Sequence, residues 1–236
     1  DEARAEARIL MQVQENILSP RYGGPIIGAI HDHITGAYFL THGNPRFGRA
    51  EAMNILFKLG NPGDKMGIEI PAPFVDENGA EYWTGKQLFS VVLPDDFNTT
   101  FKANICQSCD RCQKDQCPYD AYVKIRDGKL LCGTIDVKAI GNSKGKILDR
   151  IARDYGSDRA ALFINQVTRL ALGAIMNHGF STGIGDEDIP EEAALQIANN
   201  TQDCIDKVSE LVQSYRDGTL EQMPGRSLRE TLEVSV

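Results

Sequence analysis

Four cysteines lie close together in the middle of the sequence: Cys106, Cys109, Cys112 and Cys117. Thiolates are preferred ligands of Zn²⁺ in tetrahedral structural sites, and closely spaced cysteines can surround a single ion. The spacing also approaches that of bacterial ferredoxins, in which the last gap is about three residues instead of the four found here. The sequence therefore predicts a structural metal site at these four residues, with zinc favoured over an iron–sulfur cluster.

Two alternatives to a metal site stay open for this cluster. The cysteines could be free thiols, or they could form a disulfide, as intracellular proteins of hyperthermophiles do. Cys132 could replace one of the four ligands if that ligand cannot turn inward. Cys204 lies beside the apolar stripe of a predicted helix, and we expect it to be a buried structural thiol.

A run of three acidic residues, Asp186-Glu187-Asp188, is the second candidate for metal chemistry. Convergent carboxylates are what an octahedral Mg²⁺ centre for phosphoryl transfer needs. The triplet, however, precedes a predicted helix, and acidic residues are favoured there as caps. We interpret it as a cap. The sequence contains neither a Walker loop nor a G-x-G-x-x-G motif, and His31 and His33 are spaced unfavourably for joint metal ligation.

The elements that must position these residues are mostly helices. Apolar periodicity and capping signals predict helices over 2–13, 28–40, 49–59, 158–177 and 190–216, a short one after Thr84 and a last one after Ser227. Asp127-Gly128 is a strong turn signal and predicts a hairpin over 118–135. The stretch 61–82, rich in Pro and Gly, predicts short strands and turns. The expected fold class is α+β, with mixed helices and short antiparallel strands followed by a mostly helical part.

Composition limits the function classes. The 236 residues are 42% hydrophobic and 25% charged, which suits one large or two small globular domains. A net charge of −8 argues against a free-standing nucleic-acid binder, but not against a part of a larger assembly. No apolar run reaches the roughly 20 residues that span a bilayer, and the first residues do not form a signal peptide. We expect a cytoplasmic protein without membrane contact, and a piece of a longer chain.

Six blocks of the sequence occur in the order known from one family. They are EARAEARILM at 2–11, SPRYGGPIIGAIHDHITG at 19–36, WTGKQLFS at 83–90, GKLLCGTIDVKAIG at 128–141, HGFSTGIGDEDI at 178–189 and SLRETLE at 227–233. With these blocks the chain resembles the largest subunit of multi-subunit DNA-dependent RNA polymerases, of the archaeal type. The blocks extend along nearly the whole chain, so the resemblance is far more specific than a single motif.

The resemblance implies three parts: the end of the active-site region (1–45), the pore domain with the cysteine-rich insertion (46–145) and part of a helical funnel (146–236). It also implies that Lys138, Asp32 and Arg21 lie along the channel through which nucleoside triphosphates enter and backtracked RNA leaves. We expect His42 to be a solvated loop residue.

The implied activity is Mg²⁺-dependent nucleotidyl transfer by the whole enzyme. The implied partners are the other polymerase subunits, DNA, RNA, nucleoside triphosphates and a transcript cleavage factor. The family's magnesium-binding loop, Asn-Ala-Asp-Phe-Asp-Gly-Asp, is absent from this sequence and is expected shortly upstream of Asp1. We therefore expect no catalytic residue in this chain and no polymerising activity of the chain by itself. The alternative hypothesis is a stand-alone zinc or iron–sulfur module built on the cysteine cluster.

Overall fold

The computed structural model describes residues 1–60, 69–106, 112–143 and 145–236. These residues form two compact units, Asp1–Phe180 and Ser181–Val236. Both helices and small antiparallel sheets are present, so the predicted α+β class is confirmed. The proposed division of the chain at 45 and 145 stays a prediction.

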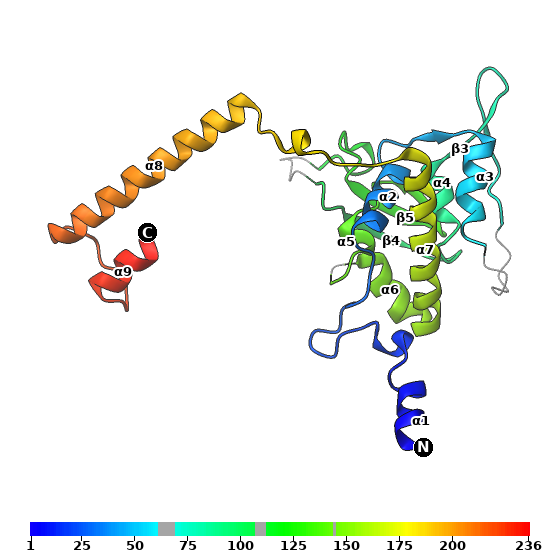
Figure 1. Cartoon of the computed structure of the whole chain (residues 1–236), viewed down its shortest axis with the longest axis horizontal. Helices are drawn as coiled ribbons and strands as arrows, with labels where there is room; N and C mark the ends of the chain where they lie inside the picture. Colours follow the sequence, from blue (N-terminus) through cyan, green and yellow to red (C-terminus); the bar gives the residue numbers. More distant parts are fainter. Residues whose placement is uncertain (61–68, 107–111, 144) are drawn as a thin grey trace. The chain divides into compact units, whose positions relative to one another are not determined.

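The first unit is built around the long helix α7 (Ser157–His178). Helices α2 (Asp32–Thr41), α3 (Arg49–Phe57) and α6 (Lys146–Tyr155) pack against it (Figure 1). The backbones of α2 and α7 approach closely at Gly36, where an added Cβ would lie 2.1 Å from the carbonyl oxygen of Ala171. Because glycine has no Cβ, this position permits the close approach of the two helices.

The other helical elements of this unit are short. They are α1 (Glu2–Ile9), η1 (Val13–Asn16), α4 (Gly85–Ser90), η2 (Lys114–Gln116) and α5 (Val137–Ile140). The predicted capping box of α4 is confirmed, since the Gln87 backbone N–H donates to Thr84 Oγ1 at 3.3 Å and the Thr84 N–H donates to Gln87 Oε1 at 2.9 Å. The two donors at the helix start are thereby satisfied.

Two three-stranded antiparallel sheets complete the first unit. Strands β1 (Arg46–Phe47), β3 (Glu81–Thr84) and β2 (Phe74–Val75) form one, in that order. Strands β4 (Thr99–Lys102), β5 (Tyr122–Arg126) and β6 (Lys129–Cys132) form the other. The β5–β6 hairpin confirms the turn prediction, because both Asp127 and Gly128 have positive φ, as a primed hairpin turn requires. Strand β4 was not predicted.

Two predicted elements of the first unit differ from the structure. The helix expected from Gly28 begins at Asp32, because Ala29 instead bridges Gly141 and its N–H donates to the Ile140 carbonyl at 2.8 Å. The N-terminal helix ends at Ile9, and the residues expected on its inward face, Ile9, Leu10 and Val13, are exposed. That prediction is wrong because nothing in the described part of the chain covers these side chains.

The second unit, all of whose residues are described, contains η3 (Ile184–Glu187), α8 (Glu191–Arg216) and α9 (Leu228–Ser235). The helix predicted over 190–216 is confirmed, as is the capping box of α9. No residue of α8 is buried, because the helix that packs against it in this unit, α9, has 8 residues and α8 has 26. Cys204 is therefore exposed, and the prediction of a buried thiol is wrong.

Candidate functional site

The loop that joins β4 to β5 carries the four-cysteine motif. Its base is closed by the Ala103 N–H, which donates to the Ala121 carbonyl at 2.8 Å. Just above this base the Cys106 N–H donates to the Ala103 carbonyl at 3.3 Å, and the Asp120 N–H donates to the Cys117 carbonyl at 3.0 Å. The sheet therefore brings the two ends of the motif to one closed base, as a single metal ion bound by the loop would require.

Three of the four predicted ligands, Cys106, Cys112 and Cys117, lie within the described residues. Cys109 lies outside the described residues, while Cys106 and Cys117 are half-buried and Cys112 is exposed, all three without a disulfide. Within the described residues, no three His, Cys, Asp or Glu side chains form a group that could hold a metal ion. The four-cysteine site stays a prediction.

Cys132 lies under the same loop. The Asp115 carboxylate of η2 accepts a hydrogen bond from the Lys124 ammonium on β5 and lies 3.9 Å from the Cys132 sulfur on β6. Burial, and then the negative charge of Asp115, raises the pKa of the Cys132 thiol. The role of Cys132 as a replacement ligand stays a prediction.

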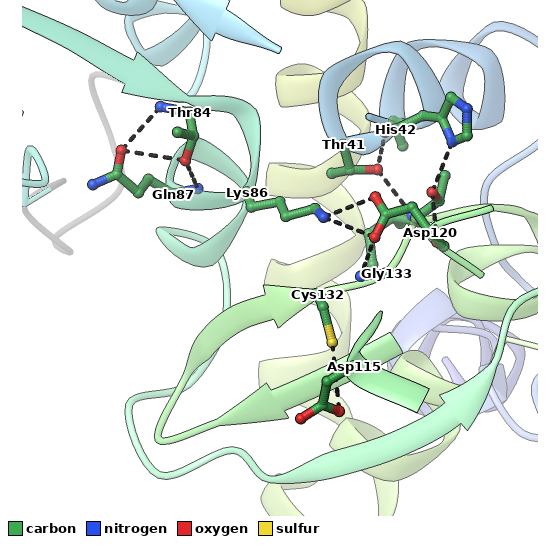
Figure 2. A network of polar contacts seen from close by, with 12 residues as sticks. Thr41, His42, Thr84, Lys86, Gln87, Asp115, Asp120, Cys132 and Gly133 are labelled. Carbon is green, nitrogen blue, oxygen red and sulfur yellow. Dashed lines mark hydrogen bonds and ion pairs between the residues drawn. The ribbon is translucent and has the colours of Figure 1, made fainter. Parts of the chain in front are cut away.

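A buried ion pair that sequence reasoning missed fixes the end of the loop. The Lys86 ammonium of α4 lies 2.9 and 2.8 Å from the two carboxylate oxygens of Asp120 (Figure 2). Asp120 Oδ1 also accepts the Gly133 N–H at 2.8 Å. The pair joins α4, the end of the cysteine loop and the segment after β6. No local feature of the sequence around Lys86 predicts this partner.

A chain of hydroxyl contacts continues from this pair to the end of α2. Thr134 Oγ1 donates to the Asp120 carbonyl at 2.9 Å and lies 3.0 Å from His42 Nδ1. Because the single hydroxyl proton is directed to Asp120, His42 Nδ1 must be the donor to Thr134. The prediction of a solvated His42 is wrong, since this contact holds the half-buried ring against Thr134.

The neighbouring Thr41 is fully buried and has both hydroxyl functions satisfied. Its hydroxyl donates to the Ala37 carbonyl at 2.8 Å and accepts the Ile135 N–H at 2.9 Å. Helix α2 is thus linked directly to the segment that connects β6 to α5.

The three residues expected along the channel lie on different segments. Arg21 is an exposed loop residue, Asp32 is the exposed first residue of α2, and Lys138 is a half-buried residue of α5. In the described part of the chain their side chains make no hydrogen bond or ion pair with one another. Whether they line a channel stays a prediction.

Asp136, which sequence reasoning did not single out, sets the position of Lys138. Its buried carboxylate accepts the Lys138 N–H at 2.9 Å through Oδ1. Through Oδ2 it accepts the N–H groups of Asn104 at 2.5 Å and Ile105 at 3.2 Å. One carboxylate therefore caps α5 and holds the start of the cysteine loop.

The acidic triplet acts as a cap. Asp186 Oδ2 accepts the Gly183 N–H at 2.7 Å at the start of η3. The interpretation as a cap of the following helix is wrong, because α8 has no side-chain cap at its N-cap residue, Pro190, and Asp186 caps this short 3₁₀ turn instead.

The helices of the described residues contain no segment long and apolar enough to cross a bilayer.

Residues 16–187 match the family model described as RNA polymerase Rpb1, domain 3. The chain is 48% identical over all of its residues to DNA-directed RNA polymerase subunit Rpo1N of Methanothermobacter thermautotrophicus and covers 26% of that subunit. It is 46% identical to the Rpo1N subunit of Thermoplasma acidophilum, again over its whole length and 26% of the relative.

A third relative, the Rpo1N subunit of Methanocaldococcus jannaschii, is 45% identical over the whole chain, which covers 17% of that subunit. The chain thus spans about a quarter or less of the length of these relatives. The family model covers both sides of the cysteine loop and most of the first unit. On this match the chain belongs to the family RNA polymerase Rpb1, domain 3.

Proposed function

We propose that this chain is a part of the largest subunit of an archaeal DNA-directed RNA polymerase. In this role it contributes to the pore, or secondary channel, and to the beginning of the funnel. The observation that carries the proposal is the similarity to Rpo1N subunits over every residue of the chain. The alternative of a stand-alone cysteine-cluster module is not supported, because the family model continues far beyond the loop on both sides.

The proposed contribution to nucleotidyl transfer is architectural. The whole enzyme would use Mg²⁺ to stabilise the charge that develops during transfer, but the sequence holds no Asp-x-Asp-x-Asp loop that could bind it. We propose that the chain works in the cytoplasm beside the other polymerase subunits, with DNA, RNA and nucleoside triphosphates, and with a transcript cleavage factor at the channel. By itself it should not synthesise RNA.

Within this proposal Lys138 provides positive charge for passing phosphate groups. Arg21 helps to fix the segment beneath the catalytic loop. Asp32, the exposed first residue of α2, helps to hold the segment beneath the catalytic loop. The structure supports a positioning role for the backbone at Lys138, because Asp136 fixes it through a hydrogen bond.

A chimeric polymerase tests the proposal. The matching segment of the Methanothermobacter Rpo1N subunit is replaced by this chain, and the enzyme is assembled with its other subunits. We expect template-directed RNA synthesis, and we expect Lys138→Glu to raise the KM for nucleoside triphosphates and slow cleavage of backtracked RNA. Lys58→Glu, at an exposed position after α3, is the matched control. An assembled chimera without RNA synthesis contradicts the proposed role, and equal effects of the two variants contradict the assignment of Lys138.

We further propose that the cysteine loop binds one structural zinc ion through Cys106, Cys109, Cys112 and Cys117. The closed base formed by β4 and β5 supports this, since it holds both ends of the motif together. Bound zinc would crosslink the loop and add folding free energy to it.

Metal analysis of the purified chain tests the zinc site. We expect one zinc per chain and a colourless protein, with zinc lost in Cys112→Ser and retained in Cys204→Ser, whose thiol is exposed in the second unit. Visible absorbance with bound iron would instead establish the iron–sulfur alternative. Retention of zinc in Cys112→Ser would exclude the four-cysteine ligand set.

A further inference from the structure

The net negative charge of the chain is unevenly distributed. Residues 181–236 contain twelve acidic and four basic side chains, which gives −8, the net charge of the whole chain. The first unit is consequently neutral, with as many basic as acidic residues. A local basic surface can therefore exist on it despite the acidic composition that argued against nucleic-acid binding.

One face of the β4–β5–β6 sheet is such a surface. Side chains alternate between the two faces of a strand, and Val123, Ile125 and Leu130 are buried on the inner face. The strand register, which shifts between Lys124 and Ile125 and leaves the exposed Leu131 without a direct partner, places the following residues on the other, outward face: Thr100, Lys102, Tyr122, Lys124, Arg126, Lys129 and Cys132. The outward face therefore contains four cationic side chains and no acidic one.

Most of this positive charge is unpaired. Lys124 forms an ion pair with Asp115 of η2, which covers the middle of the face. Lys102, Arg126 and Lys129 are exposed, and among the described residues no carboxylate forms an ion pair with them. Arg126 and Lys129 are direct cross-strand partners, an arrangement of like charges that destabilises a sheet. A bound anion would relieve this repulsion.

An aromatic ring completes the surface. Tyr122 is the direct cross-strand partner of Lys102 and is half-buried. It lies four residues from Arg126 along β5, a distance of about 13 Å in an extended strand. A sheet that combines cations with an aromatic ring can bind phosphates while the ring stacks on an unpaired base.

We propose that the outward face of β4–β5–β6 binds single-stranded nucleic acid. Lys102, Arg126 and Lys129 contact its phosphates, and Tyr122 stacks on a base. A single strand is favoured over a duplex because the bases of a duplex are stacked on one another and cannot reach the Tyr122 ring. The inference rests on the charge and register of this sheet and not on the proposed function.

The experiment measures binding of the 236-residue chain to a fluorescently labelled single-stranded RNA by anisotropy over a range of salt concentrations. Three phosphate contacts predict a slope of log K against log salt of about −2. In the double variant Arg126→Gln, Lys129→Gln the slope should fall to about −0.7, because one contact remains. Tyr122→Leu should weaken binding about tenfold with an unchanged slope, because it removes stacking but no charge.

The double variant Arg4→Gln, Arg8→Gln is the matched control, since it removes the same charge from exposed positions of α1. Unlabelled single-stranded RNA, duplex and polyglutamate serve as competitors, and the fluorescence of Trp83 checks that each variant is folded. The proposal is supported if only the sheet variants weaken RNA binding and only single strands compete with the labelled RNA. The proposal is overturned if the chain does not bind at low salt or if the control variant weakens binding equally. Competition by polyglutamate also overturns it, in favour of an acidic protein partner. The polymerase assignment is unaffected by any of these results.

Discussion

The buried ion pair between Lys86 and Asp120 can be tested by removing one charge at a time. The two side chains are only 11% and 20% exposed, so Lys86→Met would leave a carboxylate that water reaches poorly. Loss of one partner of a buried pair costs about 3–5 kcal/mol. We expect a loss of about 3 kcal/mol in the free energy of unfolding, because Asp120 retains the hydrogen bond from Gly133.

A double-mutant cycle separates the pair energy from other effects of the substitutions. Asp120→Asn alone should also cost about 3 kcal/mol, since it leaves an unpaired buried ammonium. The double variant should lose less than the sum, with a coupling energy of about 2 kcal/mol. Urea unfolding can be followed by the fluorescence of Trp83, the one tryptophan of the chain, which is 3% exposed and lies near Lys86 in sequence.

The surface pair Arg150–Asp154 on α6 provides the matched control. Its side chains are 55% and 46% exposed and occupy positions i and i+4 of one helix. A coupling energy of about 0.3–0.5 kcal/mol is typical of such pairs. If the coupling between Lys86 and Asp120 is no larger than this, burial does not strengthen the pair and the reasoning is refuted.

Three further predictions follow from contacts of the first unit. Gly36→Ala should destabilise it by about 3 kcal/mol in urea unfolding, because the new Cβ would overlap a carbonyl oxygen of α7; unchanged stability would mean that the helices can separate freely. Thr41→Val should cost about 2 kcal/mol in the same assay, because the Ile135 N–H loses its acceptor, whereas Thr41→Ser should retain most of the stability. Burial and the hydrogen bond to Asp96 raise the pKa of Tyr155 to about 12. The folded state therefore holds this proton more tightly than the unfolded state, and the contribution of Tyr155 to stability should be complete below pH 10 and lost as the pH rises toward 12. The difference in phenolate absorbance between the wild type and Tyr155→Phe measures this pKa, and Asp96→Asn should lower it.

Local signals in the sequence were sufficient for much of the secondary structure. The boxes at Thr84 and Ser227 predicted helix starts, because each cap satisfies donors within four residues of itself. Asp127-Gly128 predicted the β5–β6 hairpin, because positive φ at both positions is a property of the turn itself. The order of the six blocks was enough to predict the family, which the comparisons confirm.

Contacts between distant segments decided what the sequence could not. Ala29 is extended because its N–H finds an acceptor on Ile140, although the local pattern favours a helix there. His42 is held by Thr134, and Lys86 by Asp120, neither of which is close to it in sequence. In the first unit, apolar periodicity predicts that a side chain turns inward but not which polar group it contacts. That partner depends on how α2, α4 and the cysteine loop pack together (Figure 2). In the second unit the apolar residues of α8 are at most half-buried and Cys204 is exposed, because within this unit α9 covers only part of the helix.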